Sequence, residues 1–158
     1  METTIEPTPI EIGMKWQAFR EIAFSFQRPE TELAYEALQF VVEAEWSLSF
    51  DSIGMVCTVR VKPDEKTDPF LTITTETLLA MQGLSDVAEL LTSTHPHAAQ
   101  IPIPMPLLVS IAGIGLSTTR GVLWEKSKTL DLPGLDRLLI PTINTEALLP
   151  KPETITPL

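Results

Sequence analysis

Apolar and polar residues alternate along a long central stretch of the chain, which predicts a two-stranded hairpin with one apolar face. Counting in twos, this face carries Leu38, Phe40, Val42, Ala44, Trp46, Leu48 and Phe50, and then Ile53, Met55, Cys57, Val59 and Val61. With a two-residue loop at 51–52, Phe50 would face Ile53. Trp46 would then face Cys57. A slip of one residue would turn the whole apolar set toward water, so we expect a second layer to cover this face.

Two further strands are predicted on either side of the hairpin. The first is 16–26, with Trp16, Ile22, Phe24 and Phe26 on one face and Arg20 as an exception. The other is 70–78, which is rich in threonine. The polar loop of eight residues before it is too short for a parallel crossover, so we expect this strand to lie antiparallel to the third.

Helices are predicted in the second half of the chain. Residues 82–91 carry apolar side chains at spacings near three and four, which indicates a short helix that ends before His95-Pro96-His97. Pro106 suits the first turn of a longer helix that continues to about Lys126. Its apolar stripe is Leu107, Leu108, Ile111, Ile114, Leu116 and Val122.

Small residues occur within this longer helix. Ser110, Ala112, Gly113 and Gly115 would let a neighbouring backbone approach closely. Each glycine costs about 1 kcal/mol of helix propensity, so we expect close packing as compensation. The apolar run 107–116 is far shorter than the roughly 20 residues that a bilayer requires, and we predict no membrane span.

The predicted fold class is α+β, with a four-stranded antiparallel sheet that has one face covered by C-terminal helices. A length of 158 residues suits one domain. We interpret 1–13 as a mobile N-terminal arm, 14–149 as the domain and 150–158 as a loose C-terminal tail. Asn144 or Thr145 would begin a last helical turn through Leu148.

A formal net charge of −10 argues against sequence-independent nucleic-acid binding, which needs basic residues. The acidity is spread along the chain and is interpreted as a solubility feature. The single cysteine, Cys57, excludes an internal disulfide, and its place on an apolar strand face indicates a core residue in a reducing compartment. The first nine residues are acidic and contain prolines, unlike a secretory leader, so we expect a cytoplasmic protein.

No constellation for catalysis emerges from the sequence. His95 and His97 could chelate a metal, but no Cys, Asp or Glu falls close enough to complete a site. The glycine-containing run 113–121 lacks the Gly-Lys-Ser/Thr ending of a phosphate loop, and no G-x-S-x-G turn occurs. Glu43 and Glu45 are interpreted as a solvated strand face. We therefore predict no catalytic residues, no metal, no cofactor and no enzymatic activity.

The order of these elements resembles the SecB family of export chaperones. The local matches are Phe70-Leu71, Gln82-Gly83-Leu84, Pro106 at the start of the long helix and Arg120-Gly121 within it. The segment 139–148, Leu-Ile-Pro-Thr-Ile-Asn-Thr-Glu-Ala-Leu, is similar to the closing Leu-Ala-Pro-Val-Asn-Phe-x-Ala-Leu of that family. The resemblance covers about residues 16–149 and rests on the order and spacing of these matches.

The resemblance implies a homotetramer, a dimer of dimers with helices sandwiched between two sheets, which acts in protein transport. Its grooves would hold unfolded preproteins without ATP. Thr72 or Ile73 stands where the family has an acidic residue that helps bind the translocation motor, so service to that motor is in doubt. SecB-like chaperones attached to toxin-antitoxin pairs fit the sequence equally well.

Other departures from the family pattern limit what carries over. Leu107-Leu108-Val109 replaces aromatic and basic residues, 123–137 is longer than its equivalent, and the tryptophan-bearing crossover before the second strand is missing.

Two functional hypotheses follow. The first is an ATP-independent holdase that binds unfolded or extended apolar polypeptide. Its peptide-binding residues would be Phe24, Phe26, Phe40, Trp46 and Phe50, and ordinary core burial is the alternative for each. The second is a non-catalytic assembly protein whose apolar surface is used up by its own oligomer, a tetramer or dimer, or by one fixed partner.

Overall fold

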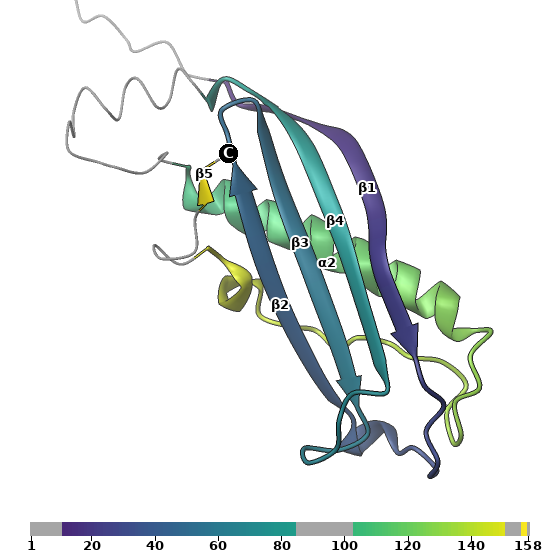
Figure 1. The fold of residues 1–158 in the computed structure, drawn as a ribbon. Coiled ribbons are helices and arrows are strands. Elements are labelled where there is room, and N and C mark those ends of the chain that lie inside the picture. Colours follow the sequence, from purple (N-terminus) through teal and green to yellow (C-terminus); the bar gives the residue numbers. More distant parts are fainter. Residues whose placement is uncertain (1–10, 85–102, 151–155, 158) are drawn as a thin grey trace, which may run out of the picture.

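Four long strands and one long helix make up most of the described chain (Figure 1). The computed structural model describes residues 11–84, 103–150 and 156–157. The strands are β1 (Gly13–Phe26), β2 (Gln39–Leu48), β3 (Ser52–Lys62) and β4 (Leu71–Gln82), and the helix is α2 (Met105–Ser127). Short elements are the 3-10 turns η1 (Tyr35–Ala37) and η2 (Thr145–Leu148) and the two-residue strand β5 (Thr156–Pro157). The predicted α+β fold is confirmed.

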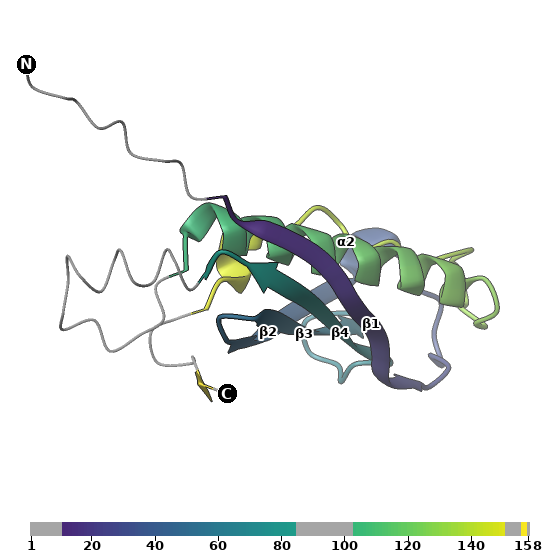
Figure 2. The ribbon, with the colours of Figure 1, turned by 90° about the horizontal axis from the view of Figure 1, so that it is seen from above.

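The four long strands form one antiparallel sheet in the order β1-β4-β3-β2, and β5 pairs in parallel with the outer edge of β2. The predicted antiparallel pairing of the third and fourth strands is confirmed. Helix α2 and the segment after it lie on one face of the sheet, so the molecule has two layers (Figure 2). The expectation that a second layer covers the apolar face is therefore correct.

Helix α2 crosses the sheet obliquely. Gly115 lies over Met55 of β3, and one turn later the Thr119 hydroxyl is 2.8 Å from that of Thr75 in β4. Near the end of the helix, the Lys126 ammonium forms an ion pair with Glu21 of β1 at 2.9 Å. The middle of the helix therefore lies over β3 and β4 and its last part over β1, and Figure 1 shows the helix starting on the β2 side of the sheet.

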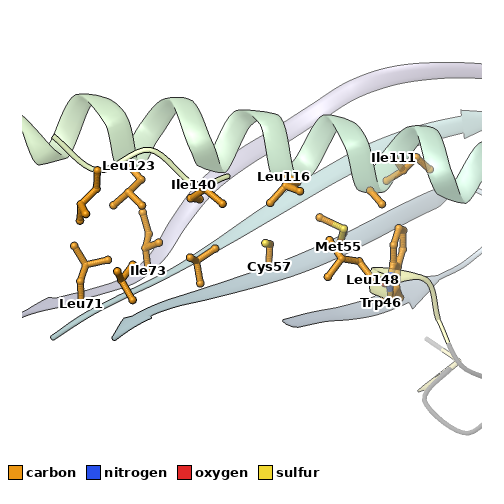
Figure 3. Packing of buried hydrophobic residues seen from close by; sticks show 14 of the residues in the cluster. Trp46, Met55, Cys57, Leu71, Ile73, Ile111, Leu116, Leu123, Ile140 and Leu148 are labelled. Atoms are coloured by element: carbon orange, nitrogen blue, oxygen red, sulfur yellow. The ribbon is translucent and has the colours of Figure 1, made fainter. Parts of the chain in front are cut away.

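The core lies between these two layers. Every second residue of β3 and β4 is buried on the side of the helix, as period-two patterning requires. Figure 3 shows these side chains pointing toward Ile111, Leu116 and Leu123 of α2 and toward Ile140 of the C-terminal segment. Polar pairs occupy the opposite sheet face, including Thr58 with Thr74.

The hairpin register differs from the prediction by two residues. Leu48 faces Ile53 and Trp46 faces Met55, so Trp46 does not face Cys57. The Ser52 amide donates to the Ser49 hydroxyl at 3.0 Å, and the Ser49 amide donates to the Ser52 carbonyl at 2.9 Å. These bonds close the turn one residue earlier than predicted. The shift of two keeps the same residues on the apolar face, so the predicted face is correct although the facing pairs are wrong.

Strand β1 is longer than predicted and contains two bulges. The bulges fall between Trp16 and Ala18 and between Glu21 and Ala23. Each bulge inserts one residue and reverses which side the next side chains face. This explains why Arg20 broke the predicted pattern, since it lies opposite Glu76 on the polar face. The prediction that Ile22 shares the apolar face is wrong, because it is the inserted residue and is half exposed.

The helix predictions have mixed outcomes. The helix after Pro106 is confirmed and runs without a break through its glycines. The last turn is also confirmed, as η2, and the Glu146 amide donates to the Asn144 side chain at 3.1 Å. The predicted helix 82–91 is wrong at its start, because Gln82 ends β4. Its remainder from 85 onward lies outside the described residues, as do His95 and His97.

Candidate functional site

The five aromatic residues predicted to bind peptide do not form one surface. Phe24 and Phe26 lie half-buried on the helix side of β1, and Phe40 lies on the same side of β2. Phe26 and Phe40 occupy one row of the sheet but are separated by two strands, which corresponds to roughly 14 Å. Trp46 lies toward the opposite end of β2, and Phe50 is an exposed residue in the turn. The structure therefore separates the set into four places.

Trp46 is a core residue. Its side chain is only 6% exposed, and its indole Nε1 donates to the Leu148 carbonyl in η2 at 2.8 Å. This bond attaches the C-terminal segment to the sheet, and Figure 3 shows Trp46 beside Leu148 at the end of the core. Trp46 is therefore an ordinary core residue, which was the alternative that the sequence analysis gave for each aromatic.

The beginning of β1 carries an uncovered apolar surface that the sequence analysis did not select. Met14 and Trp16 face Met81 and Leu79 of β4, which are buried on the helix side of the sheet. Trp16 is nevertheless 50% exposed and Met14 is 41% exposed. Because α2 reaches β1 only near Glu21, the start of this strand extends beyond the helix.

The helix-side row of β1 continues from this uncovered end into the core. Phe24 lies under the Lys126 ammonium, 4.7 Å from its ring centroid, and Phe26 packs edge-on against Phe70 at 6.4 Å between centroids. We call the row of Met14, Trp16, Phe19, Phe24 and Phe26 the β1 row.

Met14 and Trp16 are exposed, whereas Phe19, Phe24 and Phe26 are half-buried. The charged Glu21, which faces the buried Thr75, interrupts the row between Phe19 and Phe24. The open apolar part of the row therefore lies at the start of the strand. The alternation along 16–26 placed Trp16, Phe24 and Phe26 on one face but missed Phe19, because the first bulge reverses the side that the following side chains face. Only the helix crossing revealed which end of the row is open.

A second apolar surface lies on the outer side of α2. Ser117, Arg120, Gly121 and Trp124 of the helix and Leu139 of the C-terminal segment line a shallow groove of about 330 Å³. The Arg120 guanidinium Nε donates to the Ile140 carbonyl at 2.9 Å, which holds the segment against the helix. Trp124 is 37% exposed and stacks with Arg137 at 4.8 Å. In the sequence, the spacing of four and three residues between Ser117, Gly121 and Trp124 is the signal from which one shared helix face could have been predicted.

A third hollow, of about 490 Å³, lies between the loops that follow β1 and β3. One of its acidic residues, Asp64, accepts hydrogen bonds from the Lys66 and Thr67 amides and from the Thr67 hydroxyl. The hydroxyl bond is the largest cause of the lowered pKa of this carboxyl, followed by the Lys66 amide bond. Asp64 therefore serves the turn in which it sits.

The side chains that the sequence analysis considered for chemistry and that the structure describes are Cys57, Glu43 and Glu45. Burial raises the pKa of the Cys57 thiol to about 11, against a smaller opposite effect of the Thr119 hydroxyl. Within 11–84 and 103–150, no three His, Cys, Asp or Glu side chains are grouped so that they could hold a metal ion. Glu43 pairs with Arg60 at 2.6 Å and both Glu43 and Glu45 are exposed, as the sequence predicted. The predicted absence of enzymatic activity stays a prediction.

Helix α2 is long and apolar enough to cross a membrane by length and composition alone, and it is the one such helix among the described residues. Its buried residues pack against the sheet, as in the core helix of a two-layer fold. The predicted absence of a membrane span stays a prediction.

Comparison with known proteins adds no assignment. The chain matches no protein-family model, and no curated protein shows significant similarity to it. What the structure defines is a class of architecture, a four-stranded antiparallel sheet with one long helix packed on it.

Proposed function

We propose that this protein is a non-catalytic holdase of the SecB type, which binds extended apolar polypeptide without ATP. The observation that carries the proposal is the open end of the β1 row, where Met14 and Trp16 stay exposed beside an outer strand. Two of the five aromatics predicted from the sequence, Phe24 and Phe26, continue this row and belong to the proposed binding surface. Trp46 is excluded from the proposed surface by its burial.

The outer edge of β1 suits a segment in extended conformation. An outer strand has backbone N–H and C=O groups that point away from the sheet, and an added strand can bond them whatever its sequence. Alternate side chains of that segment would lie on Met14 and Trp16. The first bulge follows Trp16, so regular pairing would cover only the few residues from Gly13 onward.

Such a surface favours weak and tolerant binding. Apolar burial stabilises a complex by roughly 25 cal/mol per Å², and the ordering of a flexible client offsets much of it. Backbone hydrogen bonds add affinity without selecting a sequence. The expected client is therefore an unfolded or extended apolar segment with few sequence requirements.

Tryptophan fluorescence tests the proposal directly. In a Trp124→Phe background, Trp16 is the one exposed tryptophan, because Trp46 is buried. Adding a reduced, alkylated polypeptide that cannot refold should shift the Trp16 emission to shorter wavelength as the ring loses water. Trp16→Glu should weaken binding of that polypeptide at least tenfold.

The matched control is Trp124→Glu, which changes an exposed tryptophan on the outer side of α2. It should leave polypeptide binding within about twofold of the parent. Equal losses for both variants, or no binding by the parent protein, would contradict a holdase surface on β1.

The groove on α2 favours a second candidate function. In this function the protein is an assembly protein whose apolar surface is consumed by its own oligomer or by one fixed partner. An apolar dye separates the two functions. An open β1 row should enhance the dye fluorescence of the native protein, and Trp16→Glu should reduce that enhancement, whereas a surface sealed in an assembly should leave the dye dark.

A further inference from the structure

The five arginines of the chain fall into two groups. Arg20, Arg28 and Arg60 each form an ion pair with a carboxylate. Arg120 and Arg137 form no ion pair with a carboxylate of the described residues, although the chain has 21 acidic residues and 11 basic ones. Arg120 lines the groove on α2, and Arg137 stacks on the tryptophan that lines it. Both of these arginines therefore lie at one place on the surface.

The groove on α2 presents hydrogen-bond donors and contains no carboxylate. Its lining residues are Ser117, Arg120, Gly121, Trp124 and Leu139. The Arg120 Nε donates to the Ile140 carbonyl at 2.9 Å, which fixes the guanidinium in place. The N–H groups on its terminal nitrogens have no acceptor among the described residues. The groove is therefore suited to a group that carries negative charge.

The groove also has an apolar wall, which Trp124 and Leu139 form with 37% and 41% of their surface exposed. The Arg137 guanidinium lies 4.8 Å from the Trp124 ring centroid, so a second positive charge adjoins this wall. Arg137 contributes to the lowered pKa of the Glu125 carboxyl, but Glu125 forms its ion pair with Lys128, at 2.7 Å. An apolar wall and two cations are thus combined in one hollow.

Gly121 keeps the groove open. A Cβ at this position would meet no atom of the described residues within 4 Å. Glycine lowers helix propensity, and the sheet does not require it here as it does at Gly115. A larger side chain at residue 121 would enter the groove, so a substitution can close the groove without changing the core.

We propose that the groove on α2 binds a short acidic segment of a partner polypeptide, in which an aspartate or glutamate lies beside a large apolar side chain. The carboxylate would accept hydrogen bonds from the Arg120 guanidinium, and the apolar side chain would pack on Trp124 and Leu139. A shallow hollow of about 330 Å³ suits a few side chains of a polypeptide better than a small molecule, which binds best where most of its surface is enclosed.

Charge decides between the possible occupants of the groove. A net charge of −10 repels acidic segments from most of the surface, so they are attracted only where local cations outweigh that field. A neutral or basic segment would leave the Arg120 guanidinium without a counter-charge. A second copy of this chain packed symmetrically on the groove would bring the same two arginines toward their counterparts. An acidic partner is the occupant that the charges fit.

This inference goes beyond the holdase proposal, because the groove lies on α2 and the β1 row lies on the sheet. It names the chemistry of the fixed partner in the second candidate function. The two surfaces can be tested separately, since each carries its own exposed tryptophan, Trp16 on β1 and Trp124 on α2.

A peptide titration reads the groove directly. In a Trp16→Phe background, Trp124 is the one exposed tryptophan, because Trp46 is buried. The blocked peptide acetyl-Asp-Phe-Asp-Leu-amide should shift the Trp124 emission to shorter wavelength as it covers the ring. The same peptide with asparagine in place of both aspartates should bind at least tenfold more weakly, because it keeps the shape and loses the charge.

A pair of glycine variants shows whether the peptide occupies the groove. Gly121→Leu should weaken binding of the aspartate peptide at least tenfold, and the helix should be retained because leucine is the better helix former. Gly113→Leu is the matched control, since a Cβ there also meets no atom within 4 Å and Gly113 does not line the groove. It should bind the peptide within about twofold of the parent.

Charge at the wall is tested by Arg137→Gln, which removes a guanidinium that stacks on Trp124. This variant should weaken the aspartate peptide about fivefold and leave the asparagine peptide unchanged. Selection from random heptapeptides displayed on phage, with the Gly121→Leu protein present in excess as competitor, supplies an unbiased measurement. It should enrich aspartate or glutamate beside phenylalanine, tryptophan or leucine.

The proposal is overturned if the aspartate and asparagine peptides bind equally, if Gly121→Leu binds like Gly113→Leu, or if the selection enriches basic or uncharged sequences. A lower mass of Gly121→Leu than of Gly113→Leu by light scattering would show that a second copy fills the groove, and would also overturn it. Trp16→Glu should bind the aspartate peptide like the parent. That result would hold whether or not Trp16→Glu still binds unfolded polypeptide, so the two proposals fail separately.

Discussion

Gly115 of α2 and Met55 of β3 are in direct contact, and a methyl group at residue 115 would lie 2.3 Å from the Met55 Cε. Met55 is fully buried. The glycine therefore sets how closely the helix approaches the sheet, and the close packing that the sequence analysis expected is found here. At Gly113, two residues earlier, the same methyl group would enter open space among the described residues.

Alanine at these two glycines should have opposite effects on stability. Gly115→Ala gains helix propensity but overpacks the core, which costs about 1–3 kcal/mol, so the net change should be destabilising by about 1 kcal/mol. Gly113→Ala should stabilise the isolated protomer by up to about 1 kcal/mol. Urea unfolding of both alanine variants and of the parent protein measures these changes. Equal stabilisation by both substitutions would contradict the contact with Met55.

Two threonines on β4 should respond in opposite directions to the same substitution. The Thr119 hydroxyl donates to the Gly115 carbonyl at 2.8 Å, so the bond between Thr75 and Thr119 uses the Thr75 proton. Thr75→Val should destabilise the protein by about 1 kcal/mol through the loss of this buried bond. The Thr77 hydroxyl is buried without a hydrogen-bond partner in the described residues, so Thr77→Val should stabilise by about 1 kcal/mol.

Chemical denaturation of both valine variants provides the comparison. Valine and threonine have similar shape and strand preference, so the difference reports the hydroxyl groups. A loss of stability at both positions would indicate that Thr77 has a partner after all.

Cys57 should make the protein less stable at alkaline pH. Its pKa is raised from 9.0 to about 11 by burial, so between these values the unfolded chain releases the thiol proton while the folded protein keeps it. The unfolded state then binds fewer protons, and the free energy of unfolding falls as pH rises from about 9 to 11, by about 3 kcal/mol in total. Below pH 9 this contribution does not vary with pH.

The alkaline loss should be smaller in Cys57→Ala, which has no thiol to titrate. Native Cys57 should also resist a thiol reagent at pH 8 and react at once after unfolding, because the thiolate is the reactive form. Rapid labelling of the native protein would show that the core between α2 and the sheet opens readily.

Alanine substitutions of two tryptophans on the sheet should distinguish an effect on stability from an effect on polypeptide binding. Trp46→Ala removes a buried ring and leaves the Leu148 carbonyl without its donor, so it should cost about 3–5 kcal/mol. Trp16→Ala changes a half-exposed ring and should cost less than about 1 kcal/mol while weakening polypeptide binding. Thermal unfolding followed by circular dichroism compares them. A stability loss at Trp16 as large as that at Trp46 would mean that the β1 row is ordinary core.

The hairpin and β1 show where local patterning stops being sufficient. Strand period and apolar face follow from side-chain alternation, and both are correct for β2 and β3. The register depends on the turn, where the Ser49 hydroxyl accepts from the Ser52 amide, and alternation does not report this bond. The bulges of β1 likewise depend on its pairing with β4, so Arg20 looked like an exception while Ile22 looked regular.

By itself, the sequence determined the fold class, the four antiparallel strands, the long helix after Pro106 and the last turn at Asn144, because these follow from periodicity and from the backbone preferences of single residues. Only the tertiary structure decided which apolar residues are surface. That depends on the oblique path of α2, held by Gly115 over Met55 and by Lys126 at Glu21. This path partly covers the end of β1 and leaves Trp16 open, since the burial of a side chain depends on residues that are distant in sequence.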